Sequence, residues 1–371
     1  VSVDGDTAVV GAYVEDTLVG PDAGAAHWYR RVGGAWVHGG QLLAPDAEIE
    51  DRFGIAVDVS GDWIAVGAYW DVVAGNVDQG SVYLFRREGE DWVFDAKLSD
   101  SSGNPGDYFG FALSLDGDTL AVGARGDSDI TLEQGTVHVY QRQGGSWIAQ
   151  ARIDPPQVNS QGYFGASVSV AGDRLLVGAP GMTIEPGPFA AGAAYVYARS
   201  GSDWQPAGVL QAPRPASNAG YGYSVASDRQ RLLVGAFQDG DQARGAGFVY
   251  RADTLALDGE LRASLAQPGE VAGIAVALAG PRAYLGAPGF DRNGINGSGR
   301  VLVFERGVDG WREASQWFAV DAADGDAFGR ALAADASGNV VVGAPAKGSD
   351  NPLEGMAYSV RIDALLRDGF E

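Results

Sequence analysis

The sequence predicts an all-β fold, a β-propeller of seven blades in which each blade is a four-stranded antiparallel meander and the last is incomplete. Three features of a repeated unit support this prediction: a Gly-Ala pair after a short apolar run, a Phe-Gly pair upstream of it, and a later strand with two apolar faces. The Gly-Ala pair recurs at nearly even spacing, at Gly11-Ala12, Gly67-Ala68, Gly123-Ala124, Gly178-Ala179, Gly235-Ala236, Gly286-Ala287 and Gly343-Ala344. A chain of 371 residues would ordinarily suggest about two or three domains. The even repetition favours a single array of repeats instead.

The first two strands of each repeat are expected to form a hairpin. The first strand follows a Phe-Gly pair or a variant of it, at Phe53-Gly54, Phe109-Gly110, Phe164-Gly165, Tyr221-Gly222, Ala272-Gly273 and Phe328-Gly329. A tight turn such as Ser60-Gly61-Asp62 then leads into the apolar run. Because Gly beside Asp tolerates a positive φ, this pattern is typical of a β-hairpin.

The third and fourth strands complete the unit. The third opens with Gly and covers residues 24–29, 80–85, 135–140, 192–197, 245–250, 299–304 and 355–360. The fourth usually begins with Trp, at Trp36, Trp92, Trp147, Trp204 and Trp311. In residues 80–85 both strand faces are apolar, whereas a sheet with one solvated face would alternate. We therefore expect each sheet to be a blade stacked between neighbours rather than half of a sandwich.

Composition and charge exclude several classes of function. Acidic residues outnumber basic ones and give a formal net charge of −22, which repels nucleic acid and anionic lipid surfaces. No apolar run is long enough to cross a bilayer, so we expect no membrane insertion. The absence of Cys excludes disulfides, Cys-ligated zinc and thiol catalysis.

These residues resemble the FG-GAP repeat, the unit of the integrin α-subunit head and of many bacterial surface and secreted proteins. The match is close from Phe164-Gly165 through Val177-Gly178-Ala179-Pro180 to Ala194-Tyr195-Val196-Tyr197, and the resemblance covers residues 1–362. It implies a seven-bladed propeller that binds other macromolecules. Calcium-binding members carry an Asp-rich loop between the first two strands, but this chain has short turns there, with too few oxygen ligands. We therefore expect no metal and no cofactor, and calcium should be dispensable for folding.

The three His residues do not predict catalysis. His27 and His138 occupy a repeat position held elsewhere by Tyr83, Tyr195, Phe248, Leu302 and Tyr358, so packing roles are expected for both. His38 lies beside Trp36 in the fourth strand and is expected to have no partner His, which makes a catalytic zinc site improbable. No Gly-x-Ser-x-Gly motif accompanies the many Ser residues. No catalytic residue is therefore assigned, although a carboxylate pair acting on polysaccharide stays open.

Two loop segments contain short motifs that are expected to be ordinary solvated turns. Arg125-Gly126-Asp127 matches an adhesion tripeptide, but such a short motif recurs by chance. Residues 291–296 place oxygen ligands at cation-loop spacing but lack the bidentate Glu of a full loop.

The strand order points to one face for binding. The long, acidic loops between strands 2 and 3 and between strands 4 and 1 lie at the same end of a meander, where binding residues concentrate on rigid scaffolds. Candidate binding residues in these loops are Asp71, Asp78, Asp127, Asp129, Asp239, Asp241, Asp291 and Asn293. We expect a monomeric, secreted or cell-surface recognition or adhesion module for a protein or glycan. The alternatives are a polysaccharide hydrolase or lyase with carboxylates in the central funnel, and a non-catalytic scaffold.

The ends of the chain carry a further prediction. We expect the propeller to cover residues 1–363, followed by a short tail at 364–371. The seventh repeat shows no convincing fourth strand, so that strand is predicted to lie upstream of Val1. Residues 1–3 should then be innermost in the first blade and pack beside the seventh.

Overall fold

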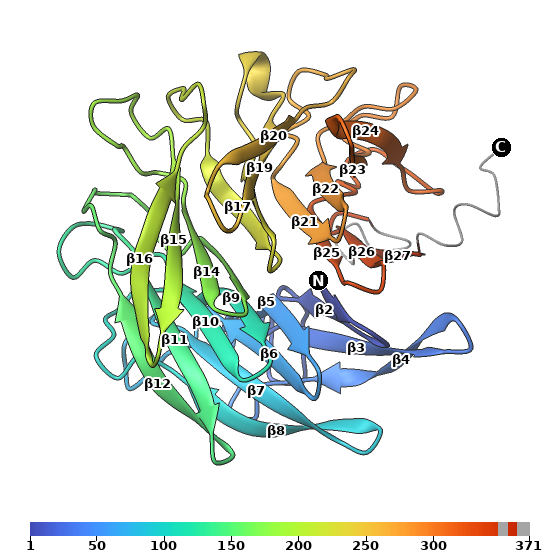
Figure 1. Cartoon of the computed structure of the whole chain (residues 1–371). Coiled ribbons are helices and arrows are strands. Elements are labelled where there is room, and N and C mark those ends of the chain that lie inside the picture. The colour runs from blue at the N-terminus through green and yellow to red at the C-terminus, as the bar shows by residue number, and fades with distance from the viewer. Residues whose placement is uncertain (348–354, 362–371) are drawn as a thin grey trace. The chain divides into compact units, whose positions relative to one another are not determined.

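The computed structural model describes residues 1–347 and 355–361 and contains six four-stranded sheets and one three-stranded sheet (Figure 1). All neighbouring strands for which a register is defined are antiparallel, and the sheets follow the meander order of the repeat. Within the described residues the sole helical segment is the 3-10 turn η1 (Asp241–Ala243). The chain is thus a seven-bladed β-propeller whose last blade has three strands, which confirms the predicted fold class.

The chain divides into two compact units, of which one covers Asp6–Asn218. Its strands are β2 (Thr7–Ala12), β3 (Ala25–Val32) and β4 (Ala35–Leu42) of blade 1; β5 (Phe53–Ser60), β6 (Trp63–Ala68), β7 (Ser81–Glu88) and β8 (Asp91–Leu98) of blade 2; β9 (Phe109–Asp116), β10 (Thr119–Ala124), β11 (Thr136–Gln143) and β12 (Ser146–Ile153) of blade 3; and β13 (Ser167–Ala171), β14 (Arg174–Ala179), β15 (Ala193–Ser200) and β16 (Asp203–Leu210) of blade 4.

The other unit covers Val1–Gly5 and Ala219–Glu371. Its strands are β1 (Ser2–Asp4) of blade 1; β17 (Tyr221–Ser227), β18 (Arg231–Ala236), β19 (Ala246–Arg251) and β20 (Leu257–Leu261) of blade 5; β21 (Ala275–Ala279), β22 (Arg282–Ala287), β23 (Arg300–Gly307) and β24 (Gly310–Trp317) of blade 6; and β25 (Ala331–Ala334), β26 (Asn339–Ala344) and β27 (Met356–Arg361) of blade 7.

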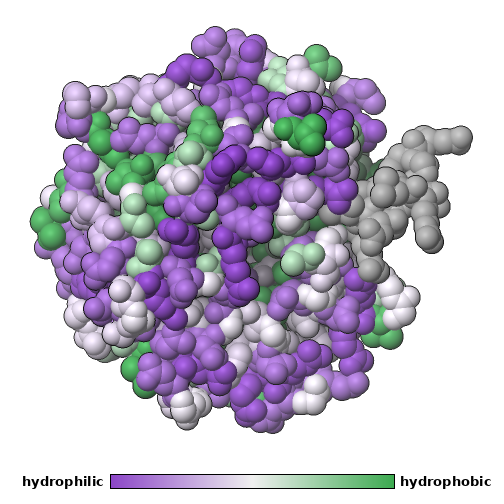
Figure 2. Space-filling model, viewed as in Figure 1, coloured by the Kyte–Doolittle hydropathy of each residue, from purple (hydrophilic) through white to green (hydrophobic). Residues whose placement is uncertain are grey.

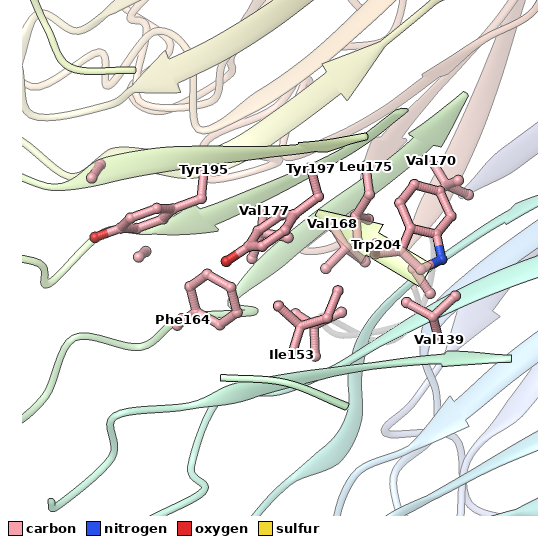
Figure 3. Packing of buried hydrophobic residues seen from close by; sticks show 14 of the residues in the cluster. Val139, Ile153, Phe164, Val168, Val170, Leu175, Val177, Tyr195, Tyr197 and Trp204 are labelled. Carbon is pink, nitrogen blue, oxygen red and sulfur yellow. The ribbon is translucent and has the colours of Figure 1, made fainter. Parts of the chain in front are cut away.

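In blades 2 to 4 the Phe of the Phe-Gly pair packs against the rings of two third-strand residues. In blade 4 the ring centroid of Phe164 lies 5.4 Å from that of Tyr195 and 6.3 Å from that of Tyr197, both in edge-to-face geometry (Figure 3). Val139 and Ile153 of blade 3 belong to the same cluster, so neighbouring blades share one apolar layer. Edge-to-face pairs of this kind contribute about 0.5–1.5 kcal/mol beyond the area that they bury.

The glycines of the repeat mark the joint between neighbouring blades. A Cβ atom on Gly67, in the Gly-Ala pair of blade 2, would lie 2.1 Å from the carbonyl oxygen of Gly110 at the start of blade 3. A Cβ on Gly80, at the head of the third strand, would lie 2.1 Å from the carbonyl oxygen of Phe109. Because these contacts are with backbone atoms, no side chain can move aside. The glycines of the Phe-Gly and Gly-Ala motifs therefore recur together, because their backbones are in close contact and leave no room for a side chain.

The start of the chain packs beside the seventh blade, as predicted (Figure 1). The backbone N–H of Gly5 donates to Oδ2 of Asp335 at 3.0 Å, and Asn339 Nδ2 donates to the carbonyl oxygen of Gly5 at 2.9 Å. The strand order places β1 at one edge of the blade 1 sheet, next to β2. The predicted tail at 364–371 lies outside the described residues, and a fourth strand upstream of Val1 stays a prediction.

Candidate functional site

Three of the predicted binding residues occupy one repeat position, the third after the Gly-Ala pair, and lie below the surface. Their exposed fractions are 3 % for Asp71, 1 % for Asp127 and 4 % for Asp239. Each carboxylate pairs with a base from the end of the blade's fourth strand: Asp71 with Lys97 at 2.7 Å, Asp127 with Arg152 at 2.9 Å, and Asp239 with Arg262 at 2.5 Å. Buried charges require such partners, so these acids hold the long loops in place.

The other predicted residues are at or near the surface. Asp129 is exposed and contacts Arg152, the same guanidinium that holds Asp127. Asp78 is half-buried in the β6–β7 loop, where its carbonyl oxygen accepts the N–H of Tyr108 at 3.1 Å.

Asp241, Asp291 and Asn293 belong to the unit that contains blades 5–7, and all three are exposed. Oδ1 of Asp291 accepts the N–H of Gly297 within its own loop at 2.7 Å. The eight predicted residues thus do not form one cluster within either unit, and their role in binding stays a prediction. Among the described residues, no group of three His, Asp or Glu side chains could hold a metal ion.

Two buried acids close the loops that lead into blades 2 and 3. Oδ2 of Asp51 accepts the N–H of Glu48, and Oδ2 of Asp107 accepts the N–H of Asn104, each at 2.6 Å. Burial raises the pKa of each carboxyl to about 6, and the charge of an acid on the neighbouring loop adds to this shift. Since both side chains are buried, neither can reach a ligand from solvent, and they do not resemble an open pair of hydrolytic carboxylates.

A cluster of half-buried aromatic and arginine side chains lies at the long-loop end of blades 2–4. We call it the aromatic–arginine patch, and it consists of Arg52, Tyr69, Trp70, Tyr108, Phe111, Arg125 and Tyr163. The Tyr69 ring centroid lies 5.2 Å from that of Trp70, and 5.7 Å from those of Tyr108 and Phe111. Hydrophilic residues cover most of the face shown in Figure 2, with hydrophobic residues scattered among them.

The backbone turn before each first strand positions three of these side chains. Arg52, Tyr108 and Tyr163 each precede a Phe-Gly pair and have φ of 59°, 57° and 52°. In blade 3 the N–H of Phe111 donates to the carbonyl oxygen of Tyr108 at 3.1 Å, which closes the turn. The left-handed conformation costs an L-residue about 1–2 kcal/mol, so bulky side chains are held there by the surrounding structure.

Arg125 is the centre of the patch. Its guanidinium carbon lies 4.0 Å from the Phe111 ring centroid, 5.9 Å from that of Tyr108 and 5.7 Å from that of Tyr163. Its Nε is buried without a hydrogen-bond partner, and no carboxylate in the described parts of the chain lies within ion-pair distance of it. Arg52, by contrast, stacks on Trp70 at 4.8 Å and also pairs with Asp22 at 3.0 Å. Arg125 is therefore a positive charge with aromatic neighbours and no counter-ion.

The sequence motif Arg125-Gly126-Asp127 is not displayed as a free tripeptide. Asp127 is buried and paired, and the Arg125 side chain lies among aromatic rings. The aromatic–arginine patch was not among the predicted sites, because its residues flank the two repeat motifs and do not belong to the acidic loop positions. The residue after Gly-Ala is Tyr69 or Arg125 here but Pro180 in blade 4, and this difference was a usable signal.

The expected packing role is confirmed for His138 and wrong for His27. His138 lies edge-to-face against Phe109, with ring centroids 5.3 Å apart, and is buried. His27 is half-buried, and its ring centroid lies 5.4 Å from that of His38. His27 Nδ1 lies 3.2 Å from His38 Nε2, which also corrects the expectation that His38 has no partner.

The family comparison agrees with this architecture. The chain is a β-propeller built from repeats whose Phe-Gly and Gly-Ala motifs form the blade joints. The FG-GAP repeat model matches residues 36–85, 92–140, 147–197 and 311–360, so the chain belongs to the FG-GAP repeat family. Each match begins in the fourth strand of one blade and ends in the third strand of the next.

The matched segments leave out residues 198–310, although the structure forms blades 5 and 6 there. None of the curated proteins with which the sequence was compared matches it significantly. Within residues 1–347 and 355–361, no helix has the length and apolar character needed to span a membrane.

Proposed function

We propose that this protein is an exported recognition module that binds a glycan through the aromatic–arginine patch. The single observation that carries the proposal is the unpaired guanidinium of Arg125 among half-buried aromatic rings. Aromatic rings offer flat apolar surface to a sugar ring, and a guanidinium offers a planar fork of donors to a carboxylate. A glycan that carries carboxylates can therefore stack its sugar rings on the aromatic side chains and pair a carboxylate with the guanidinium.

The net charge of the chain restricts the ligand further. A formal charge of −22 repels dense polyanions, so the carboxylates of the ligand should be widely spaced along a mostly neutral chain. Asp78, whose backbone binds Tyr108, and the exposed Asp129 would then form an acidic rim that excludes densely charged polymers. Recognition through a rigid scaffold with variable loops is also the role that the FG-GAP resemblance implies.

A protein ligand is the second candidate, and the tips of the long loops favour it. Exposed apolar side chains lie in these loops, namely Leu18, Val19, Ile49, Val72, Val77, Ile130, Leu132, Val158 and Phe189. Apolar side chains at the centre of a contact and polar ones at its rim are the usual arrangement of a protein interface.

The test measures binding of neutral and carboxylated oligosaccharides to the purified chain, first on an array and then by calorimetry. Arg125→Ala should weaken binding of the carboxylated glycan about 10- to 100-fold, since a hydrogen bond to a charged group contributes about 1.5–3 kcal/mol. Arg125→Lys should recover only part of the loss because Lys lacks the planar fork.

Arg199→Ala is the matched control. Arg199 also stacks on an aromatic ring, that of Trp204 at 4.9 Å, but lies at the short-turn end of its blade. It should leave binding unchanged. Equal binding by wild type and Arg125→Ala would overturn the glycan proposal, and binding of an acidic peptide with no glycan bound would favour the protein alternative.

A further inference from the structure

Blade 1 contains two histidines and a carboxylate in mutual contact, outside the aromatic–arginine patch. His27 lies on β3, His38 lies on β4 and Glu15 lies in the loop after β2. His27 Nε2 is 2.7 Å from Oε2 of Glu15, and His27 Nδ1 is 3.2 Å from Nε2 of His38. Gln41 Nε2 donates to the other Glu15 oxygen, Oε1, at 2.7 Å. Both oxygens of the carboxylate are thus fixed.

A β-bulge brings these side chains to one face of the sheet. His27 is opposite Gln41, and Tyr29 is opposite His38, but the register shifts by one residue between Trp28 and Tyr29. Residues three apart on a regular strand point to opposite faces, whereas the extra residue of the bulge returns His38 to the face of Gln41. His38 therefore lies beside His27 because of the bulge and not because of simple alternation.

The same two positions hold aromatic residues in blade 2. Tyr83 and Phe94 replace His27 and His38, with ring centroids 6.3 Å apart, and the ring of Phe53 covers Tyr83. In blade 1, His27 is half-buried and His38 is exposed. Both positions in blade 1 thus hold an imidazole that solvent can reach.

The carboxylate determines which nitrogen of His27 is available. A carboxylate accepts hydrogen bonds but cannot donate, so the proton of neutral His27 must be on Nε2, facing Glu15. Nδ1 then carries a lone pair directed at His38. Nε2 of His38 can either donate a proton to it or present a second lone pair beside it. A metal-bound His characteristically donates its other N–H to a carboxylate, and this is the arrangement around His27.

We propose that Nδ1 of His27 and Nε2 of His38 bind one divalent transition-metal ion, with water completing its coordination and Glu15 orienting His27. The nitrogen separation of 3.2 Å is close to the roughly 3.3 Å expected for two ligands at about 2.0–2.1 Å from a tetrahedral ion. Among such ions Cu²⁺ should bind most tightly and Zn²⁺ less so, following the order of nitrogen-ligand affinities. This inference is independent of the proposed glycan binding.

The test titrates the purified chain with Cu²⁺ or Zn²⁺ salts. We expect one strong site, with nitrogen hyperfine structure from two imidazoles in the electron paramagnetic resonance spectrum of the Cu²⁺ form. An acidic surface also collects cations, but its carboxylate oxygens give no nitrogen coupling, and they favour hard ions such as Ca²⁺. A spectrum with oxygen ligands alone would overturn the proposal.

Variants taken from the repeat itself provide matched controls. His27→Tyr and His38→Phe introduce the residues that blade 2 has at these positions, and each should weaken Cu²⁺ binding at least 10-fold. Glu15→Gln should weaken it about 10-fold, the usual result of removing a carboxylate behind a metal-bound His. His138→Phe, in blade 3, should leave binding unchanged. Retention of wild-type affinity by both His27→Tyr and His38→Phe would overturn the site.

A measurement on the wild-type protein tests the site without relying on variants, which could fail to fold. Zn²⁺ added below one equivalent should shift the imidazole ¹⁵N resonances of two of the three histidines. The unshifted resonance should be that of His138, which disappears in His138→Phe. Equal shifts of all three, or of none, would contradict a site formed by His27 and His38.

Discussion

His27 in blade 1 and His138 in blade 3 occupy the same position of the repeat, but their environments differ. The side chain of His27 is 25 % exposed and contacts Glu15 and His38, whereas that of His138 is 9 % exposed, lies against the ring of Phe109 and has Nε2 3.6 Å from Oδ2 of Asp100. Burial lowers the pKa of His138, because the charged imidazolium is desolvated there.

In blade 3 the ring of Phe109 covers this position, whereas in blade 1 the ring centroid of His27 lies 5.4 Å from that of His38. The Phe109 ring makes the third-strand position of blade 3 part of the core. In blade 6, where Ala272 replaces the Phe, the position holds Leu302, an aliphatic residue that is fully buried. The comparison shows that the side chains around this repeat position determine whether it is packed in the core or forms hydrogen bonds.

The largest expected effect is the loss of that ring. Phe109→Ala should lower the free energy of unfolding by about 3–5 kcal/mol, because it removes a buried ring from a packed joint. The pKa of His138 should rise toward its ordinary value as water reaches the imidazole. Denaturant unfolding and NMR titration measure the two effects. Phe189→Ala, at an exposed loop position, is the control and should cost less than about 0.5 kcal/mol.

Substitution of the Gly in the Gly-Ala pair should destabilise blades 1 and 3 equally, because the close backbone contact of this Gly does not involve the Phe ring. A Cβ on Gly11 would lie 1.9 Å from the carbonyl oxygen of Gly54, and one on Gly123 would lie 2.0 Å from that of Gly165. Gly11→Ala and Gly123→Ala should each cost about 3 kcal/mol, measured by thermal and urea unfolding.

Gly61→Ala is the control for this pair of variants. Gly61 has φ of 57° and no atom near the position of a Cβ, so its replacement should cost about 1 kcal/mol for the backbone conformation alone. A cost for Gly11→Ala no larger than that of Gly61→Ala would mean that blade 1 is not joined to blade 2 as the other joints are.

A smaller effect concerns the buried acid at the entrance of blade 3. Burial, together with the charge of Asp127, raises the pKa of Asp107 to about 6, above the value of about 3.9 expected in the unfolded chain. The folded state therefore binds this proton more tightly, so the contribution to stability is full below about pH 4 and is lost as the pH rises through 6.

Asp107→Asn should remove this pH-dependent loss of stability, and the amide oxygen of the new side chain can still accept the N–H of Asn104. We expect it to raise the free energy of unfolding by about 1–2 kcal/mol at pH 8 and to change it little at pH 4. Urea unfolding across this range measures the difference. A constant offset at both pH values would contradict the raised pKa.

The smallest expected effect is in blade 1. His38→Phe, measured with chelator present, should change the free energy of unfolding by less than about 0.5 kcal/mol, because the side chain is exposed. A loss of several kcal/mol would show that the His38 side chain contributes to packing despite its exposure.

Most of the fold could be predicted from the sequence because its determinants are local and repeated. The Gly-Ala pairs fixed the ends of second strands such as β6 and β10, and turns such as Ser60-Gly61-Asp62 fixed the hairpins. Even blade 5 and the first three strands of blade 6, which the family model does not match, were predicted from Gly235-Ala236 and Gly286-Ala287. A strand is recognisable from a few neighbouring residues with alternating polarity and an adjacent turn. The strand pattern of blade 6 is therefore still recognisable although Ala272 replaces the Phe.

The sites were decided by tertiary structure, because each joins residues that are distant in sequence. The β-bulge after Trp28 places His38 beside His27, and the positive φ of Tyr108 brings its ring to Arg125. Whether an acid such as Asp127 is exposed or buried against Arg152 depends on where the fourth strand ends, not on the loop that carries the acid. Sequence periodicity determines which face of its own strand a side chain occupies, but register shifts and blade stacking determine what that side chain contacts.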